Sequence, residues 1–162
     1  MAEVAIFMGS KSDLDKLSDG ITILKDFGVS HEVHVCSAHR SPAYLMEILK
    51  NLEQQGLQVV IAAAGGAAHL AGVCAAHTIL PVIGVPMDIP PLNGLDSLLS
   101  TVQMPGGIPV AAVSIGRAGA KNAALLAVAI LSLKDAQLRE RLLQYRKRMA
   151  AEIQRQDQEL NQ

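Results

Sequence analysis

Short apolar runs alternate with longer amphipathic stretches along the 162-residue chain. The apolar runs have the character of β-strands and lie at residues 4–8, 32–36, 58–64, 81–86 and 109–115. The stretches between them carry helical patterns. Regular alternation of strands and helices predicts parallel β-α-β winding. Because the strand runs lack a polar face, we expect a sheet that helices cover on both sides.

This pattern predicts a three-layer α/β/α sandwich with a flavodoxin-like parallel sheet. We expect one domain over residues 1–162, in which a C-terminal helix at about 135–156 forms an extension. Apolar residues recur at helical spacing in that extension: Leu138, Leu142, Tyr145, Met149 and Ile153. Such a stripe favours association with further copies of the chain. The alternatives are a helix that docks on its own subunit and a solvated tail past about residue 150.

Composition narrows the range of partners. The formal net charge is −1, from 14 basic and 15 acidic residues, so we expect neither nucleic acid nor an anionic membrane as a partner. The N-terminus lacks the pattern of a signal peptide, and the longest apolar stretch is too short for a membrane span, which together predict a cytoplasmic protein. Cys36 and Cys74 lack CxxC spacing, which favours buried, reduced thiols.

In an open parallel sheet, ligands bind outside the carboxyl ends of the strands, so the loops that follow the strands are the candidate site. The first loop, MGSKSDL at 8–14, places Ser10, Ser12 and Asp13 where a helix begins. The N–H groups of a helix start favour an anion such as phosphate. Local capping is the competing interpretation, because Ser12 and Asp15 have the spacing of a capping box.

The loop VCSAHRSPAY at 35–44 places His39 and Arg40 side by side at the end of the second strand. Ser41 and Pro42 fit the N-cap and first position of the following helix, but they do not account for the histidine and the arginine. Arginine can bind phosphate through paired N–H groups, and histidine exchanges a proton near neutral pH. An ordinary exposed loop remains the alternative.

The loop AAAGGAAHLAG at 62–72 follows the third strand and contains Gly65, Gly66 and His69. Only methyl groups or hydrogens stand between Ala62 and Ala68, so a planar ligand can lie against backbone whose N–H groups bind a carboxylate. The same composition also suits a tight turn and close helix packing.

The sequence lacks an HExxH, a CxxC pair, a GxSxG, a Walker A motif and a GxGxxG. What remains is a positioned histidine, an arginine, a serine and aspartate loop, and a glycine and alanine pocket. This set favours proton transfer on a phosphorylated small molecule, without a metal or a redox cofactor.

Six motifs occur in one order over residues 8–127: MGSKSD, SAHRSP, AGGAAHLAG, PVIGVP, LNGLDSLLSTVQMPGG and IGRAGAKNAALLA. Together they resemble the family of class I N5-carboxyaminoimidazole ribonucleotide mutases of purine biosynthesis. The resemblance implies an enzyme without a cofactor that moves a carboxylate from the exocyclic amine to the adjacent ring carbon of its ribonucleotide substrate. It also implies a homo-octamer.

The resemblance assigns roles to particular residues. It implies that His39 is the general acid and base and that Arg40 binds the substrate phosphate. The other implied substrate-binding residues are Ser10, Ser12, Asp13, Ser37, Ala38, Gly65, Gly66, Ala67, Ala68, His69 and Leu70.

The chain departs from the pattern of this family at Ala63, Ala71 and His77, and MDIPPLNG replaces a more polar connector. We expect His77 to pack inside an alanine-rich helix. Two other functions remain open. One is a class II enzyme that carboxylates aminoimidazole ribonucleotide directly with CO2, and the other is a non-catalytic nucleotide-binding module of the same fold.

Overall fold

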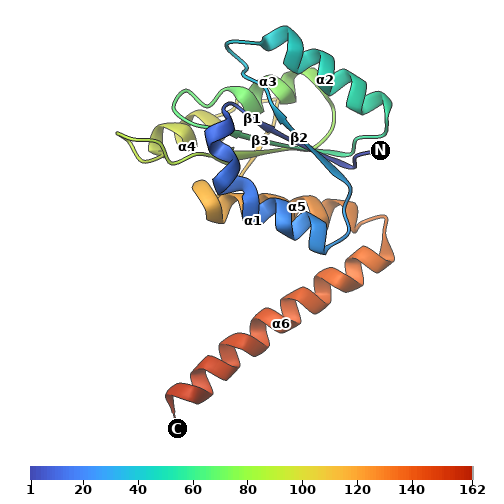
Figure 1. The fold of residues 1–162 in the computed structure, drawn as a ribbon, viewed down its shortest axis with the longest axis vertical. Coiled ribbons are helices and arrows are strands. Elements are labelled where there is room, and N and C mark those ends of the chain that lie inside the picture. Colours follow the sequence, from blue (N-terminus) through green and yellow to red (C-terminus); the bar gives the residue numbers. More distant parts are fainter. Residues whose placement is uncertain (162) are drawn as a thin grey trace.

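A computed structural model describes residues 1–161 and confirms the expected layers (Figure 1). The strands are β1 (Val4–Met8), β2 (His31–Val35), β3 (Val59–Ala64), β4 (Val82–Pro86) and β5 (Ala111–Ala112). The helices are the short η1 (Lys11–Asp13), α1 (Leu14–Asp26), α2 (Pro42–Gln54), α3 (Leu70–His77), α4 (Leu95–Val102), α5 (Gly116–Leu131) and α6 (Ala136–Leu160).

The five strands form one parallel sheet in the order β2-β1-β3-β4-β5. The chain passes from β1 to β2 on one side and then returns to β3 on the other side. This reversal opens a crevice at the carboxyl ends of the strands, where ligands bind in doubly wound folds. The strand order therefore confirms the flavodoxin-like sheet and places the loops after β1, β2 and β3 at one edge.

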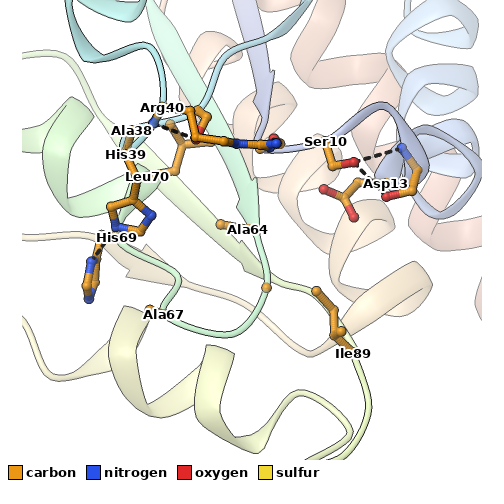
Figure 2. A pocket seen from close by; sticks show the side chains of 14 residues that line it. Ser10, Asp13, Ala38, His39, Arg40, Ala64, Ala67, His69, Leu70 and Ile89 are labelled. Carbon is orange, nitrogen blue, oxygen red and sulfur yellow. Dashed lines mark hydrogen bonds between the residues drawn. The ribbon is translucent and has the colours of Figure 1, made fainter.

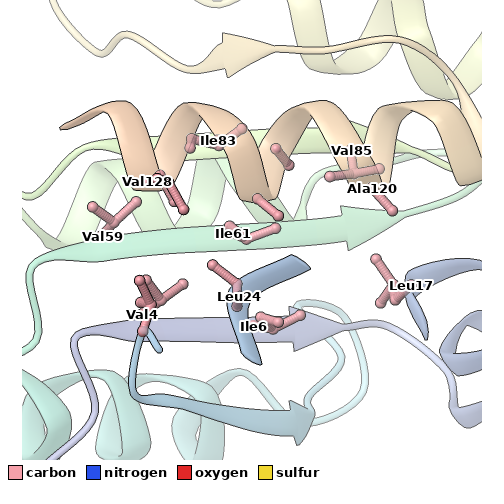
Figure 3. Close-up of a cluster of buried hydrophobic side chains, with 14 of the residues drawn as sticks. Val4, Ile6, Leu17, Leu24, Val59, Ile61, Ile83, Val85, Ala120 and Val128 are labelled. Carbon is pink, nitrogen blue, oxygen red and sulfur yellow. The ribbon is translucent and has the colours of Figure 1, made fainter. Parts of the chain in front are cut away.

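Two hydrophobic cores hold the helices on the sheet. Helices α1 and α5 cover one face, where Leu24 and Val128 pack with Ile61 (Figure 3). Gly20 permits the close approach of these helices, because a Cβ there would lie 2.5 Å from the carbonyl oxygen of Ala120. Helices α2 and α3 cover the opposite face around a second cluster of buried side chains, which includes Phe7, Leu45, Leu49, Cys36 and Cys74.

The buried cysteines agree with the expectation of free thiols. Burial raises the pKa of the Cys74 thiol to about 12 and also raises that of Cys36. Both thiols therefore stay protonated at neutral pH and serve as small apolar side chains.

The margins of the sheet differ from the sequence prediction. Strand β5 covers only Ala111–Ala112, whereas the apolar run predicted 109–115. Strand β2 lies at the other edge and leaves Val33 and Val35 exposed, so the expectation of two covered faces is wrong for this strand. An apolar run shows that a strand can be buried, but its neighbours in the sheet decide how much of it is.

Helix α6 extends away from the sandwich (Figure 1). Its first turns dock on the same subunit: Leu138 is buried, and the Tyr145 ring lies 5.6 Å from the ring of Phe27. Met149 and Ile153 are 54% and 65% exposed. The predicted stripe is thus divided between a docked part and an exposed part. No helix within residues 1–161 has the length and apolar character that a membrane crossing requires.

Candidate active site

The loops after β1, β2, β3 and β4 surround a cavity of about 300 Å³ at the carboxyl edge of the sheet (Figure 2). Most of the residues singled out from the sequence line it: Ser10, Ser12, Asp13, Ser37, Ala38, His39, Arg40, Gly65, Ala67, His69 and Leu70. The lining also includes Gly9, Ala64 and Ile89, which sequence reasoning missed. Gly66 and Ala68 belong to the same loop but do not line the cavity.

A tight turn after β2 presents His39 and Arg40. The backbone N–H of Arg40 donates to Ser37 Oγ at 3.1 Å, and the N–H of Ser37 donates to Ser41 Oγ at 3.1 Å. Helix α2 then begins at Pro42, as predicted, although the Ser41 hydroxyl bonds to the turn and not to the helix. The turn leaves both functional side chains exposed at the cavity.

The Arg40 guanidinium forms hydrogen bonds with two acceptors among the described residues. It donates to the Gly9 carbonyl oxygen at 3.0 Å and lies 3.4 Å from Ser37 Oγ. No carboxylate of residues 1–161 forms an ion pair with it. A guanidinium has five N–H donors, so donors remain for an anion in the cavity.

The loop after β1 brings further polar groups to the cavity. Ser10 is the N-cap of η1 and accepts hydrogen bonds from the Ser12 N–H at 3.3 Å and the Ser12 hydroxyl at 2.8 Å. The capping box of Ser12 and Asp15 is therefore not formed, because a turn of η1 intervenes before α1.

Asp13 is only 7% exposed. Burial raises the pKa of its carboxyl group, an effect that a hydrogen bond from the Ser10 backbone and the charge of Lys16 partly oppose. The charged form has lost water without gaining an ion pair, so a hydroxyl donor on a ligand would stabilise it.

His39 and His69 form a pair across the site, from the loops after β2 and β3. His39 Nε2 lies 2.8 Å from His69 Nδ1, and the rings meet edge to face at 87°. One nitrogen donates and the other accepts, so the contact holds a single proton. This arrangement fixes the orientation of the His39 ring and gives it a partner for proton exchange.

Helix α4 braces the loop after β3. Gly66 N–H donates to Ser97 Oγ at 2.9 Å, and Ala68 N–H donates to Ser100 Oγ at 3.1 Å. The sequence analysis expected N–H groups of this loop to bind a carboxylate. The N–H groups of Gly66 and Ala68 instead donate to helix α4 and are not free to do so. Gly66 has a positive φ of 64°, which explains the need for glycine in this turn.

A scan against family models matches residues 3–152 with the family described as AIR carboxylase. The chain belongs to the AIR carboxylase family. Similar curated proteins carry the name N5-carboxyaminoimidazole ribonucleotide mutase. The protein of Saccharolobus solfataricus is 51% identical, with 94% of this chain and 96% of the relative covered. The protein of Thermotoga maritima is 49% identical, with 100% of this chain and 94% of the relative covered. The protein of Escherichia coli K12 is 51% identical, with 94% of this chain and 90% of the relative covered.

Two solved structures have the same fold as this chain. A crystal structure of Treponema denticola PurE matches with a TM-score of 0.89 and 31% identity over 98% of each chain. A crystal structure of a variant of Treponema denticola PurE2 matches with a TM-score of 0.90 and 30% identity over 98% of each chain. The motifs that the sequence shares with this family therefore lie on a fold that these solved structures also have.

The expectation from the sequence is wrong for one residue of this family member and did not include another. His77 is exposed at the end of α3, with Nδ1 2.9 Å from the Val73 carbonyl oxygen, so the expectation of a packed side chain is wrong in the single subunit. Ile89 lines the cavity from the loop after β4. The rule that ligands meet the carboxyl ends of strands pointed to that loop, but the sequence analysis assigned none of its residues to the site.

Proposed function

We propose that this protein is an N5-carboxyaminoimidazole ribonucleotide mutase. The observation that carries the proposal is the pairing of His39 with His69 in the cavity that the Arg40 side chain also lines. A proton carrier and an anion site thus meet within one small cavity. Relatives about half identical to the chain bear the name of this mutase.

Different polar groups of the cavity would bind different parts of the substrate. Arg40 and the hydroxyls of Ser10 and Ser12 would hold the phosphate, because charged and neutral donors gather there. Asp13 would accept a hydrogen bond from a ribose hydroxyl and so regain part of the solvation lost on burial. The imidazole ring would then lie toward His39 and the loop after β3.

The reaction needs a proton to move twice. When the carbamate N–C bond breaks, its electron pair returns to nitrogen, and protonated His39 supplies the proton for the amine. The ring carbon then attacks the trapped CO2 to form the C–C bond. His39 removes the proton from that carbon and restores the aromatic ring, so no net proton is consumed. Holding CO2 beside the ring replaces a bimolecular encounter with an intramolecular step.

The alternative is a carboxylase that takes CO2 from solution, which would fit the description of the family as AIR carboxylase. The SAHRSP sequence with Arg40 favours the mutase, and we expect no need for ATP, biotin or metal because no motif for them occurs. Purified, metal-stripped protein is given either the carbamate ribonucleotide or the uncarboxylated ribonucleotide with bicarbonate, and product is followed by ultraviolet absorbance. Faster conversion of the second mixture would overturn the mutase, and conversion of neither would favour a binding module.

We further propose a homo-octamer in the cytoplasm. The exposed Met149 and Ile153 on α6 and the exposed Leu95 and Leu99 on α4 support association, because a lone subunit leaves these apolar side chains in water. Sedimentation velocity measures the assembly directly. A stable monomer across the working concentration range would contradict this proposal, and localisation is checked by fractionation of the cells that make the protein.

A further inference from the structure

Ile89 and Leu70 are the two large apolar side chains that line the cavity. Ile89 lies on the loop at 87–94, across the cavity from His39 and His69 (Figure 2). The side chain packs directly on Gly65: a Cβ built on that glycine would overlap Ile89 Cδ1 and would lie 2.6 Å from Cγ1. The isoleucine therefore occupies space that any larger residue at position 65 would take.

The base of this loop is held at several points. Met87 N–H donates to the Ala64 carbonyl oxygen at 2.9 Å, which continues the pairing of β4 with β3. The next residue, Asp88, receives Lys16 Nζ on both its side chain and its backbone, with 2.8 Å to Oδ1 and 2.8 Å to the carbonyl oxygen. Lys16 lies on α1, so a residue outside the cavity fixes the direction in which Ile89 leaves the sheet.

The chemistry of Ile89 limits what it can do. It has no donor or acceptor for the phosphate or ribose, and it is 40% exposed, so it contributes little to the core. Its contact with Gly65 places it beside the loop that faces the imidazole ring in the proposed reaction. The intermediate of that reaction is CO2, a small neutral molecule that no charged group can hold strongly. An apolar wall can block its exit and exclude water.

We propose that Ile89 retains CO2 during the carboxylate transfer and that Lys16, through Asp88, is the positioning residue for this wall. The inference rests on the mutase reaction proposed above. In the balanced sequence, cleavage of the N–C bond and protonation of the amine yield CO2 and the uncarboxylated ribonucleotide. Either the ring carbon recaptures that CO2 or it escapes, and escape leaves the ribonucleotide without a carboxylate.

The test measures this partition. Protein is mixed with substrate that carries ¹³C in the carbamate, in buffer with unlabelled bicarbonate. Mass spectrometry follows the ¹³C retained in the product and the uncarboxylated ribonucleotide released per turnover, with a correction from an enzyme-free sample. We expect Ile89→Ala to raise the released fraction about tenfold, which corresponds to a barrier to escape lower by about 1.4 kcal/mol. The Michaelis constant should change little, because Ile89 makes no polar contact.

Further variants separate retention from general damage. Ile89→Val keeps a branched apolar side chain and should retain label nearly as well as the parent protein. Lys16→Met should raise release in the same direction by a smaller factor. Leu92→Ala is the matched control, because Leu92 is on the same loop, is 56% exposed and does not line the cavity. It should behave as the parent protein.

The outcomes are distinct. Normal label retention in Ile89→Ala at normal turnover would overturn the role of the wall, as would equal loss of label in Leu92→Ala. Parent protein that fails to convert the carbamate, or whose product carries carbon from bicarbonate at every turnover, would instead refute the mutase, and the retention role would be refuted with it.

Discussion

Replacement of Ser97 by alanine should remove a hydrogen-bonded link between helix α4 and the loop after β3. The Ser97 side chain is completely buried, and its hydroxyl donates to the Met87 carbonyl oxygen at 2.8 Å while it accepts from Gly66 N–H at 2.9 Å. The variant leaves both backbone groups without this partner. A buried group left unsatisfied costs about 1–3 kcal/mol. Met87 is fully buried and Gly66 only half-buried, so we expect a total loss of about 2–3 kcal/mol.

Urea unfolding at one fixed subunit concentration measures this loss, because assembly makes apparent stability depend on concentration. Turnover should fall as well, by about tenfold, since small misplacements in a site are expensive in rate. Thr101→Val is the matched control. Thr101 is buried on the same helix, but its hydroxyl donates to the Ser97 carbonyl oxygen, which the helical backbone also satisfies.

We expect Thr101→Val to lose about 1 kcal/mol or less and to keep its turnover. The reasoning would be refuted if Ser97→Ala unfolded at the same urea concentration as the parent protein. It would equally be refuted if the two variants lost the same stability and activity. The two hydrogen bonds of the Ser97 hydroxyl would then contribute no more than the one of Thr101.

Three further substitutions probe the site and its surroundings. His39→Asn should lower turnover by at least about 10²-fold, because asparagine cannot carry the proton, while calorimetry still detects ribonucleotide binding; near-normal turnover would remove His39 from the mechanism. Asp13→Asn should be at least as stable as the parent at pH 7, because burial raises the pKa of Asp13 and its charged form destabilises the fold. This advantage should disappear below the usual pKa of 3.8, where the carboxyl is protonated in both states, as unfolding across pH will show. Lys16→Met should lower the free energy of unfolding by about 0.5 kcal/mol, which is usual for a partly exposed ion pair such as that of Lys16 with Asp88. Lys16 lowers the pKa of Asp88, so calorimetry should find this loss complete above pH 3.8 and vanishing as the pH falls through the lowered pKa.

Local pattern was sufficient for much of the fold and part of the site. The apolar runs located every strand, and the rule for carboxyl ends grouped the loops that carry Ser10, His39 and Gly65. Prediction was poorest where neighbouring segments decide how exposed a residue is or which hydrogen bonds it forms. The edge position of β2 exposes Val33 and Val35, and the bonds of Ser12 go to Ser10 and not to a capping box.

By itself, the sequence determined the layered fold class, the chemical types at the cavity and the family motifs, because hydrophobic period and turn residues are properties of neighbouring positions. Only the tertiary structure decided which loops meet. His39 and His69 are 30 positions apart and touch because the loops after β2 and β3 both lie at the carboxyl edge of the parallel sheet. Lys16 reaches Asp88 across 72 positions for a similar reason. Such contacts depend on strand order and helix packing, which no local pattern encodes.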